Sequence, residues 1–260
     1  MFVEGKVALI TGAAGEIGGA IARQLTAGGA RVALADSNVA GVRDIASQIG
    51  EGASWHECDV SDERSMEQTV AAAAKAHGRI DIGIFNAGIS VPRKPLVETE
   101  ATTYDRIMAV NARGVFLGLK HIFPAIRRQG GGSVVVTSST EGLRGNAGLA
   151  PYAASKHAII ALVKTAAIEW AEYNVRVNCI NPGPVDTAMI RALEQTSLDA
   201  GTADIRERGV SIIPMKRFAA ADEVAKFVRF LASDDASYSS GATYLVDGGM
   251  LAGKMALDEF

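Results

Sequence analysis

Tyr152 and Lys156 lie four residues apart in the stretch Tyr-Ala-Ala-Ser-Lys. At that spacing two side chains share one face of a helix, one turn from each other. Upstream, an apolar Val-Val-Val run ends in hydroxyl residues that include Ser139. A phenol, an ammonium group and a hydroxyl that meet in space can move a proton on or off an alcohol oxygen. Because Tyr-x-x-x-Lys often arises by chance, the pair gains meaning only from the elements that position it.

The composition narrows the classes of protein to which the chain can belong. Its 260 residues are 48% hydrophobic, which is ample for the core of one large α/β domain or two small ones. A formal net charge of -3 argues against nucleic acid and anionic membrane surfaces as partners. The longest apolar stretches, such as 158–163, are too short to span a bilayer, and the N-terminus lacks the pattern of a signal peptide. We therefore expect neither a membrane association nor an exported protein.

Alternating apolar runs and helical spacings indicate the elements that must position the reactive residues. Strands are predicted at 6–10, 31–35, 53–58, 81–85, 132–138, 175–180 and 242–246. Helices are predicted at 17–27, 39–49, 62–77, 101–130, 151–172 and 222–233. This alternation predicts an α/β fold, with one parallel sheet and helices on both of its faces. Cys58 and Cys179 lie near strand ends, which favours buried free thiols in a reducing, cytoplasmic location over a disulfide.

The first predicted strand runs into a glycine-rich turn that reads Thr-Gly-Ala-Ala-Gly-Glu-Ile-Gly from Thr11 to Gly18. A strand, a glycine turn and a helix in this order can cradle a pyrophosphate. The glycines let the backbone approach the phosphates, and the helix N-terminus offers N–H groups and a partial positive charge. Since many tight turns use glycine, the turn alone is weak evidence.

Asp36 ends the second predicted strand, at about the distance from the glycine turn where an acidic residue bonds the adenosine ribose. Its charge would repel the extra phosphate of NADP, and neither Gly15 nor Ser37 supplies an arginine to receive that phosphate. We therefore expect NAD as the preferred cofactor. The alternative is that Asp36 only caps a helix or stabilises a turn.

Further polar or small residues follow other predicted strands. Asp59 could accept a hydrogen bond from the adenine amino group, or it could cap the next helix together with Ser61. The small residues of the Asn86-Ala87-Gly88 turn would let a cofactor pass over the fourth strand.

Asn111 lies in the middle of the helix predicted at 101–130. Asparagine is a mediocre helix former, so it suggests a local kink or a held water there. A buried amide that simply bonds the backbone is the alternative.

The sixth predicted strand ends in Asn-Pro-Gly-Pro-Val-Asp-Thr, from Asn181 to Thr187. This rigid turn is not expected to extend the strand. The region 189–214 reads as partly helical without a clean period, which makes it a candidate mobile lid over a substrate.

From about Gly5 to Gly249 the chain resembles the short-chain dehydrogenase/reductase family. The matching stretches are Thr11-Gly12 to Gly18, Asp36, Asp59-Val60, Asn86-Ala87-Gly88, Asn111, Ser139, Tyr152 with Lys156, Pro182-Gly183 to Thr187, and Val246-Asp247-Gly248-Gly249. Each is modest alone, but their order and spacing together are specific. The resemblance implies a single Rossmann-like doubly wound domain over 1–260, with a seven-stranded parallel sheet and a substrate loop at about 187–215.

Two positions depart from the family pattern. The glycine turn of the family usually reads Thr-Gly-x-x-x-Gly-x-Gly, and Glu16 stands in place of its middle glycine. Gly15, one residue earlier, is expected to relax the backbone instead. A carboxylate near the pyrophosphate is unfavourable unless it points to solvent or bonds a ribose hydroxyl. Phe85 replaces a second asparagine that commonly precedes Asn86.

The resemblance implies an oxidoreductase that transfers hydride between a nicotinamide and a carbinol carbon. Tyr152 would be the acid/base, its pKa lowered by Lys156 and by the positive nicotinamide ring. Lys156 would also hold the nicotinamide ribose, and Ser139 would fix the substrate oxygen. Asn111 would hold a water that links Lys156 to solvent.

The resemblance also implies a set of cofactor-binding residues, and no metal is expected. Within the set, Val185 and Thr187 would orient the carboxamide. The full set is Gly12, Gly15, Glu16, Ile17, Gly18, Asp36, Asp59, Val60, Asn86, Ala87, Gly88, Tyr152, Lys156, Pro182, Gly183, Val185 and Thr187.

Mixed apolar and polar residues are expected to face the substrate, which suggests a small or medium secondary alcohol or its ketone. They are Ser139, Glu141, Leu143, Asn146 and Met189, with Leu149, Gly183, Pro184 and Ile190 beside them. Glu141 and Arg144 could recognise hydroxyls or a charge, although we prefer to interpret both as solvated loop residues.

Three hypotheses of function follow. The first is an NAD-dependent alcohol dehydrogenase of unassigned substrate. The second is a 3-oxoacyl-thioester reductase that uses NADPH, and Asp36 counts against it. The third is a non-catalytic, NAD-responsive binding protein, against which the complete set of reactive residues argues. By analogy with the family we expect a homotetramer, built on the long helices around Asn111 and Tyr152 and on the last strand.

Overall fold

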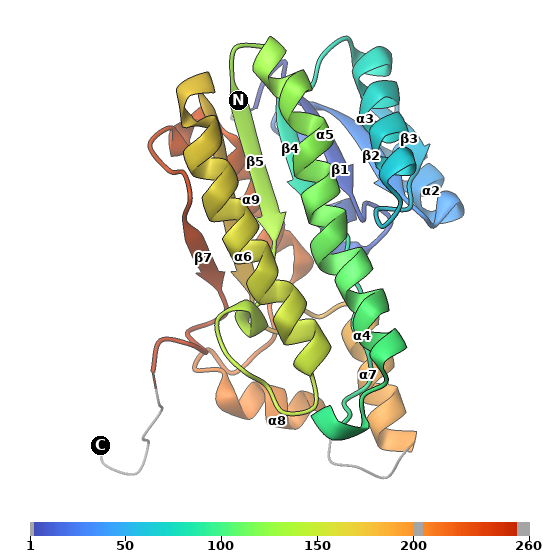
Figure 1. Ribbon diagram of the computed structural model, residues 1–260, viewed down its shortest axis with the longest axis vertical. Coiled ribbons are helices and arrows are strands. Elements are labelled where there is room, and N and C mark those ends of the chain that lie inside the picture. The colour runs from blue at the N-terminus through green and yellow to red at the C-terminus, as the bar shows by residue number, and fades with distance from the viewer. Residues whose placement is uncertain (1–2, 200–204, 254–260) are drawn as a thin grey trace.

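The computed structural model describes residues 3–199 and 205–253, and its central element is one seven-stranded sheet (Figure 1). The strands are β1 (Val7–Thr11), β2 (Arg31–Asp36), β3 (Ala53–Glu57), β4 (Ile82–Phe85), β5 (Gly132–Thr137), β6 (Val175–Pro182) and β7 (Thr243–Val246). Their order is β3-β2-β1-β4-β5-β6-β7, and every pairing between neighbours is parallel. The prediction of a seven-stranded parallel, doubly wound sheet is confirmed.

Helices connect the strands and cover both faces of the sheet. They are α1 (Glu16–Ala27), α2 (Val39–Ile49), α3 (Glu63–His77), α4 (Ala101–Ile107), α5 (Gly114–Arg128), α6 (Ala150–Trp170), α7 (Ala188–Asp199), α8 (Ile205–Ile212) and α9 (Ala221–Ala232). Single turns of 3₁₀ helix are η1 (Leu96–Glu98), η3 (Thr140–Gly142), η4 (Ala171–Tyr173) and η5 (Asp234–Ala236). None of these described helices is long and apolar enough to cross a membrane.

The inner strands of the sheet, such as β1 and β4, are buried on both faces because they are apolar at successive positions, whereas the outer strands β3 and β7 are only partly buried. Leu9 packs into a core shared with α3, α5 and α6, whereas its neighbours Ala8 and Ile10 pack into a second core shared with α1, α2 and α9. Side chains alternate between the faces of a strand, so a continuous apolar run fills both layers. In Figure 1 α5 and α6 lie side by side in front of the sheet.

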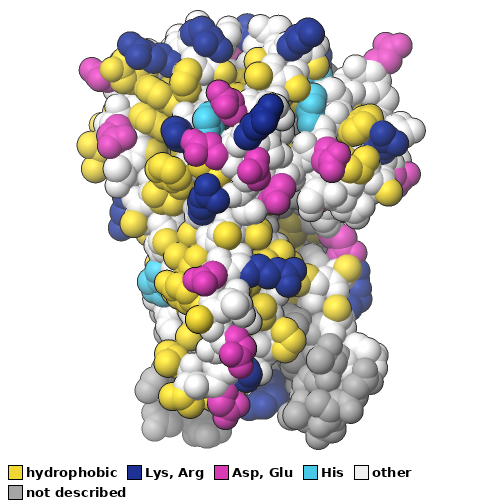
Figure 2. Space-filling model, turned by 45° about the vertical axis from the view of Figure 1, so that its right-hand side comes forward, with side chains coloured by type: hydrophobic (Ala, Val, Ile, Leu, Met, Phe, Trp, Pro, Cys, Tyr) yellow, Lys and Arg dark blue, Asp and Glu magenta, His cyan; other side chains and the backbone are white. Residues whose placement is uncertain are grey.

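The surface shown in Figure 2 mixes acidic and basic side chains, with hydrophobic ones exposed between them. The described part of this face therefore carries no large patch of a single charge.

Phe85, one of the two departures from the family pattern, has a packing role. Its ring is buried at the end of β4, and a Cβ added to Gly118 would lie 2.3 Å from it. The absence of a side chain at Gly118 thus lets α5 approach the sheet closely enough to cover the ring.

The helix predicted at 101–130 is present but is not regular. α4 and α5 are joined by the π-helical segment η2 (Met108–Arg113), which contains Asn111. The irregularity predicted at Asn111 is confirmed as this π-helical segment, of the kind often found at functional sites.

The sequence prediction for the end of the sixth strand is wrong by two residues. β6 continues through Pro182, which pairs with Val246 of β7. The neighbour on the other side, β5, ends at Thr137 opposite Ile180, so β6 beyond that point has a partner on one side only. A proline fits there because the missing N–H can face the unpaired side.

The region 189–214, predicted to be partly helical, contains α7 and α8, which lie beyond the carboxyl ends of the strands (Figure 1); residues 200–204 of this region lie outside the described part of the chain. A small third core of Ile213, Phe218 and Met250, with Ile190 packed against it, supports them. Of the tail that we left unassigned, residues 254–260 lie outside the described part of the chain.

Candidate active site

The carboxyl ends of six neighbouring strands, β3 to β6 in the order of the sheet, bring the predicted site residues to one edge. The order in which strands are added to the sheet reverses between β1 and β4, because β1 is followed by β2 on one side and β4 is followed by β5 on the other. In open α/β sheets such a switch point leaves a crevice at the carboxyl ends where ligands bind. The glycine turn follows β1, Asn86 follows β4 and Ser139 follows β5.

The glycines at the two ends of the turn are required because other backbone atoms lie too close to leave space for a side chain. A Cβ on Gly12, whose φ is +67°, would lie 2.7 Å from the Cα of Ala87, and one on Gly18 would lie 2.1 Å from the carbonyl oxygen of Gly12. Gly15 is different, because its φ of -75° suits any residue. The expectation that Gly15 relaxes the backbone in place of a glycine at position 16 is therefore wrong.

Asp36 holds the glycine turn in place from the end of β2. Its Oδ2 accepts a hydrogen bond from the N–H of Ala14 at 2.9 Å, and its Oδ1 accepts one from Asn38 at 2.9 Å. Asn38, and not Asp36, caps α2. Each carboxylate oxygen retains a further lone pair. A ribose hydroxyl can therefore still donate to the side chain that shapes the phosphate turn.

The turn and the end of β4 are joined by a hydroxyl. Thr11 Oγ1 accepts hydrogen bonds from the N–H groups of Asn86 at 3.2 Å and Ala87 at 3.3 Å. The amide of Asn86 donates to the carbonyl of Gly12 at 3.3 Å. These bonds place the Asn86-Ala87-Gly88 segment directly against the glycine turn.

Tyr152, Lys156 and Ser139 meet where α6 packs on the end of β5. Pro151 is the second residue of α6, in the first turn, where a missing N–H costs no helical hydrogen bond, and Tyr152 follows it. Lys156 is buried one turn later, with its Nζ 5.5 Å from the centre of the tyrosine ring and 3.1 Å from the carbonyl oxygen of Thr137. Ser139, also buried, forms a hydrogen bond with Tyr152.

The surroundings of the pair shift both pKa values towards the uncharged forms. Burial raises the pKa of Tyr152 to about 12; a hydrogen bond with Ser139 opposes the rise and the charge of Glu141 adds to it. Burial lowers the pKa of Lys156 to about 8. The expectation that Lys156 lowers the pKa of Tyr152 is not met by these groups alone, because burial outweighs the hydrogen bond with Ser139, which is what lowers the pKa here.

Asn111 is fully buried and bonded on both ends of its amide. Its Oδ1 accepts from the N–H of Ile89 at 2.8 Å, and its Nδ2 donates to the carbonyl of Ile89 at 2.9 Å and to Ser155 Oγ at 3.1 Å. A Cβ on Gly88 would lie 3.4 Å from both Asn111 Oδ1 and Lys156 Nζ. The structure thus brings Asn111 and Lys156 together at Gly88.

Three polar residues that we did not predict support this arrangement. Ser138 Oγ donates to the carbonyl of Lys156 at 2.9 Å, and Ser155 Oγ donates to that of Tyr152 at 2.7 Å. The buried Asn181 donates to the carbonyl of Ser139 at 2.6 Å. An asparagine that follows the buried Cys179-Ile180 pair at the carboxyl end of the strand was the signal that could have identified Asn181.

Glu141 is a buried carboxylate, so our interpretation of it as a solvated loop residue is wrong. Its Oε1 accepts hydrogen bonds from Arg144 at 3.1 Å and from Asn146 at 3.0 Å. Arg93 in turn donates to Asn146 at 2.7 Å. The loop after Ser139 thus folds back on itself and keeps a negative charge close to Tyr152.

The other expected substrate residues are more open. Leu143 and Met189 are about half exposed, and Asn146 is half-buried within the Glu141 cluster. Leu149 precedes α6, and Ile190 packs against the small third core. Among the residues expected to face the substrate, the polar Glu141 and Asn146 are therefore held by hydrogen bonds, whereas the apolar Leu143 and Met189 are partly exposed to solvent.

Asp59 bonds its own loop. Its Oδ1 accepts from the N–H of Ser61 at 2.9 Å and from the hydroxyl of Ser61 at 2.7 Å, while Asp62 caps α3. The interpretation of Asp59 as the helix cap is therefore wrong. Val60 is buried and would be 2.9 Å from a Cβ on Gly114, so it packs against α5.

The turn after β6 is anchored to the end of the sheet. The N–H of Gly183 donates to the carbonyl of Val246 at 3.0 Å, and the buried Val185 bridges to Ala219. Thr187 lies immediately before α7. Glu16 reaches this region from the glycine turn, because its carboxylate accepts the N–H of Ala188 at 3.0 Å. The carboxylate therefore does not simply point to solvent.

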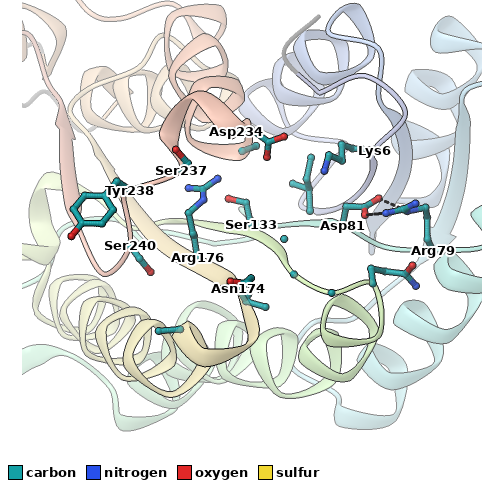
Figure 3. A pocket seen from close by; sticks show the side chains of 18 residues that line it. Lys6, Arg79, Asp81, Ser133, Asn174, Arg176, Asp234, Ser237, Tyr238 and Ser240 are labelled. Carbon is teal, nitrogen blue, oxygen red and sulfur yellow. Dashed lines mark hydrogen bonds and ion pairs between the residues drawn. The ribbon is translucent and has the colours of Figure 1, made fainter.

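A hollow of about 610 Å³ lies at the opposite edge of the sheet, between the amino ends of β1, β4, β5 and β6 (Figure 3). Its charged side chains mainly stabilise the fold. Arg79 pairs with the buried Asp81 at 2.5 Å, and Arg176 donates to the carbonyls of Leu231 at 3.0 Å and Ser233 at 2.9 Å. We therefore place the chemistry at the carboxyl edge.

Both cysteines are buried and free, as predicted. The residues at the carboxyl edge also fit a dinucleotide, because a Cβ on Gly15 would meet only the carbonyl oxygen of Gly12, at 3.4 Å, and no side chain caps the start of α1. Its first N–H groups are therefore available to a phosphate.

Comparisons with known proteins give a consistent result. A family model described as enoyl-(acyl carrier protein) reductase matches residues 12–251. Levodione reductase of Leifsonia aquatica is 36% identical over 252 residues, which cover 95% of this chain and 94% of that one. Cis-4-hydroxycyclohexanecarboxylate dehydrogenase of Sinomonas cyclohexanicum is 36% identical over 250 residues, with 95% and 97% covered.

A solved structure of similar fold is 3-ketoacyl-(acyl-carrier-protein) reductase from Brucella melitensis complexed with NADH. It superposes with a TM-score of 0.89 at 33% identity, and the match covers 95% of this chain and 99% of that one. The similarity therefore extends over nearly the whole chain.

Proposed function

This chain belongs to the short-chain dehydrogenase/reductase family, and on that premise we propose that it interconverts a secondary alcohol and its ketone with NAD as cofactor. It is an oxidoreductase of the class that acts on CH–OH groups. The observation that carries the proposal is the meeting of Tyr152, Ser139 and Lys156 beside the glycine turn, with Asn111 behind them.

In the proposed reaction Tyr152 exchanges the proton of the substrate oxygen. In reduction its phenol donates a proton to the ketone oxygen, and in oxidation its phenolate accepts one from the alcohol. Ser139 donates a hydrogen bond to the same oxygen and holds it near the phenol. The bound nicotinamide supplies the hydride exchange, and in its oxidised form a positive charge.

Lys156 and Asn111 are proposed to return the proton to solvent. Lys156 Nζ uses one of its donors on the carbonyl of Thr137, which leaves others for the nicotinamide ribose and a water. Both donors of the Asn111 amide are occupied, but Oδ1 accepts only one hydrogen bond and retains one lone pair. A water between Asn111 and Lys156 would be held there.

The preference for NAD rests on Asp36. Its carboxylate lies at the end of β2 and is bonded to the turn that would hold the pyrophosphate. A fixed negative charge there accepts ribose hydroxyls and repels a 2′-phosphate. We expect Asp36→Ala combined with Ser37→Arg to reverse the ratio of kcat/KM for NAD over NADP. A wild-type enzyme that prefers NADP would contradict this assignment.

The remaining proposed cofactor contacts come from both sides of the crevice. Gly12, Gly15, Ile17 and Gly18 would face the pyrophosphate, and Asp59 and Val60 the adenine. Asn86, Ala87 and Gly88 would lie under the ribose, and Pro182, Gly183, Val185 and Thr187 beside the carboxamide. One dinucleotide would thus touch all the strand ends of the site.

We also propose a homotetramer, of which one interface is an apolar groove on the paired helices α5 and α6. The groove has a volume of about 470 Å³ and is lined by Ala112, Arg113, Phe116, Ala158, Ala161, Leu162 and Thr165. Ile168, farther along α6, is 80% exposed. Small residues at a helix surface allow a second pair of helices to pack closely. The outer strand β7 offers a second interface.

The proposed activity is tested by initial rates with NAD and NADP on a panel of cyclic and open-chain secondary alcohols, their ketones and a 3-oxoacyl thioester. We expect NAD-linked turnover of a secondary alcohol or its ketone. Preferred turnover of the thioester with NADPH would support the acyl-thioester reductase instead. Cofactor binding without turnover of any member of the panel would favour a non-catalytic binding protein.

A further inference from the structure

Glu16 is the residue of the glycine turn that the proposed chemistry does not use. It is the first residue of α1 and stands where the family pattern has a glycine. Its Oε2 accepts the N–H of Ala188 at 3.0 Å, and its Oε1 forms an ion pair with Arg191. These partners are 172 and 175 positions away in the sequence, so Glu16 ties two distant parts of the chain together.

The bond to Ala188 caps α7 from outside. Ala188 is the first residue of that helix, and the first N–H groups of a helix have no partner within it. A carboxylate at this position does what an N-cap side chain does, and its negative charge is favourable at the positive end of the helix dipole. Glu16 therefore stabilises the first turn of α7 and holds it next to the N-terminus of α1.

Arg191 extends the tie to α8. It pairs with Asp186 at 2.9 Å, Asp186 pairs with Arg206 at 3.0 Å, and Arg206 pairs with Glu194 at 3.0 Å. Hydrogen bonds from Arg206 and Arg191 lower the pKa of Asp186, which keeps it charged at neutral pH. The name strap is used below for this group of five charged residues: Glu16, Asp186, Arg191, Glu194 and Arg206.

The strap joins the two walls of the proposed cofactor crevice. Glu16 belongs to the turn proposed to hold the pyrophosphate, and Ala188 directly follows Thr187, which is proposed to orient the carboxamide. The side chains of Glu16 and Arg191 are 41% and 48% exposed. Solvated pairs of this kind are individually weak, so the strap can open and close.

We propose that Glu16 is a positioning residue that fastens α7 across the cofactor crevice and slows release of the bound dinucleotide. This inference rests on the proposed function, because it assumes that a dinucleotide lies between the glycine turn and α7. The strap must open before the dinucleotide can leave. Loss of a helix cap changes such an equilibrium by about 2- to 30-fold, and we expect a change of about tenfold.

The experiment uses the full-length protein and four variants. Glu16→Gly removes both contacts, Glu16→Gln keeps an acceptor for Ala188 but loses the charge, and Arg191→Ala loses only the ion pairs. Arg208→Ala is the matched control, since it removes an exposed arginine of α8 that lies outside the strap. Hydrogen exchange of the α7 amides is measured without ligand, and the dissociation rate of NADH is measured by stopped-flow displacement.

We expect Glu16→Gly to raise both exchange at the start of α7 and the NADH dissociation rate by about tenfold, with Glu16→Gln and Arg191→Ala in between. Arg208→Ala should match the wild type. Added salt should speed release from the wild type more than from Glu16→Gly, because salt weakens exposed ion pairs. A purely structural role would not produce this difference.

An NADH dissociation rate that is the same in Glu16→Gly and wild type would overturn the proposal, even if exchange in α7 increased. Hydrogen exchange in α7 that is the same in Glu16→Gly and wild type would show that Glu16 does not hold the start of α7. If the wild type bound neither NADH nor NADPH, the proposed function would be wrong, and so would the proposal that Glu16 slows release of the dinucleotide. The exchange measurement would still decide whether Glu16 holds α7, so the two failures are distinguishable.

Discussion

The proton of Tyr152 is subject to opposing influences from its neighbours. Burial raises the pKa of the phenol to about 12, the charge of Glu141 acts in the same direction, and the hydrogen bond with Ser139 acts against both. The protein's own groups therefore favour the phenol, the form that donates a proton to a ketone oxygen. In the proposed oxidation, the positive nicotinamide would supply the opposing attraction.

Replacing Glu141 by glutamine should move the pH dependence of alcohol oxidation to lower pH. Oxidation needs the phenolate, so kcat/KM rises with pH until Tyr152 has lost its proton. Without the carboxylate the phenolate loses a repulsive neighbour and the freed Arg144 attracts it, and both effects lower the pKa of Tyr152. We expect a shift of roughly 0.5–1 pH unit.

The profile is measured as kcat/KM for the oxidation from about pH 6 to pH 10. The exposed Glu98→Gln variant is the control for removal of a carboxylate elsewhere. A Glu141→Gln profile that stays in place or moves to higher pH would contradict the role given to this charge.

At the scale of elements, the contact between α5 and β4 is a sensitive point of the fold. Alanine is usually better than glycine inside a helix by about 1 kcal/mol. At Gly118, however, the added methyl would lie 2.3 Å from the buried ring of Phe85. Overpacking of this kind typically costs about 1–3 kcal/mol, so we expect a net loss of stability from Gly118→Ala.

Gly52→Ala provides the control for Gly118→Ala, because a Cβ at Gly52 would meet no atom within 4 Å. Its effect should stay within about 0.5 kcal/mol. Both variants are compared by chemical denaturation. An unchanged or increased free energy of unfolding for Gly118→Ala would show that the helix shifts at no cost.

The elements that sequence predicts best are those with a local signal. Inner strands such as β1 and β4 are buried on both faces and are short apolar runs, which is why they could be placed. The outer strands β3 and β7 are only partly buried, and they were placed from the alternation of strands and helices along the chain. The positions of Tyr152, Lys156 and Ser139 followed from spacing along the chain. Asn111 was recognised as irregular because an amide in an apolar helix competes for backbone groups.

The features that the sequence did not reveal depend on distant partners. Whether β6 includes Pro182 depends on where β5 ends, and no pattern within β6 reports that. Glu141 is buried because its loop folds back through Arg144 and Asn146. The contact of Glu16 with Ala188 joins residues 172 positions apart, and local periodicity carries no information about it.

At the scale of the whole molecule, the apolar face of α5 and α6 predicts how subunits assemble. Phe116 is 49% exposed in the groove between these helices. Phe116→Asp would place a charge in the proposed interface, where it could not be desolvated cheaply. We expect the tetramer to dissociate into smaller species in light scattering after size exclusion.

Val97→Asp is the matched control for Phe116→Asp, since Val97 is 90% exposed on η1 and away from the groove. It should keep the mass of the wild type. A Phe116→Asp protein with the mass of a tetramer would remove this face from the proposed assembly.

The central claim is that Tyr152 exchanges the proton while the rest of the molecule binds and positions the cofactor. Its most direct test is the turnover number of Tyr152→Phe beside its dissociation constant for NADH. The exposed Tyr238→Phe serves as control. We predict a loss of turnover of about 10²- to 10⁴-fold for Tyr152→Phe, with NADH affinity unchanged. Turnover equal to that of the wild type across the pH range would contradict the account.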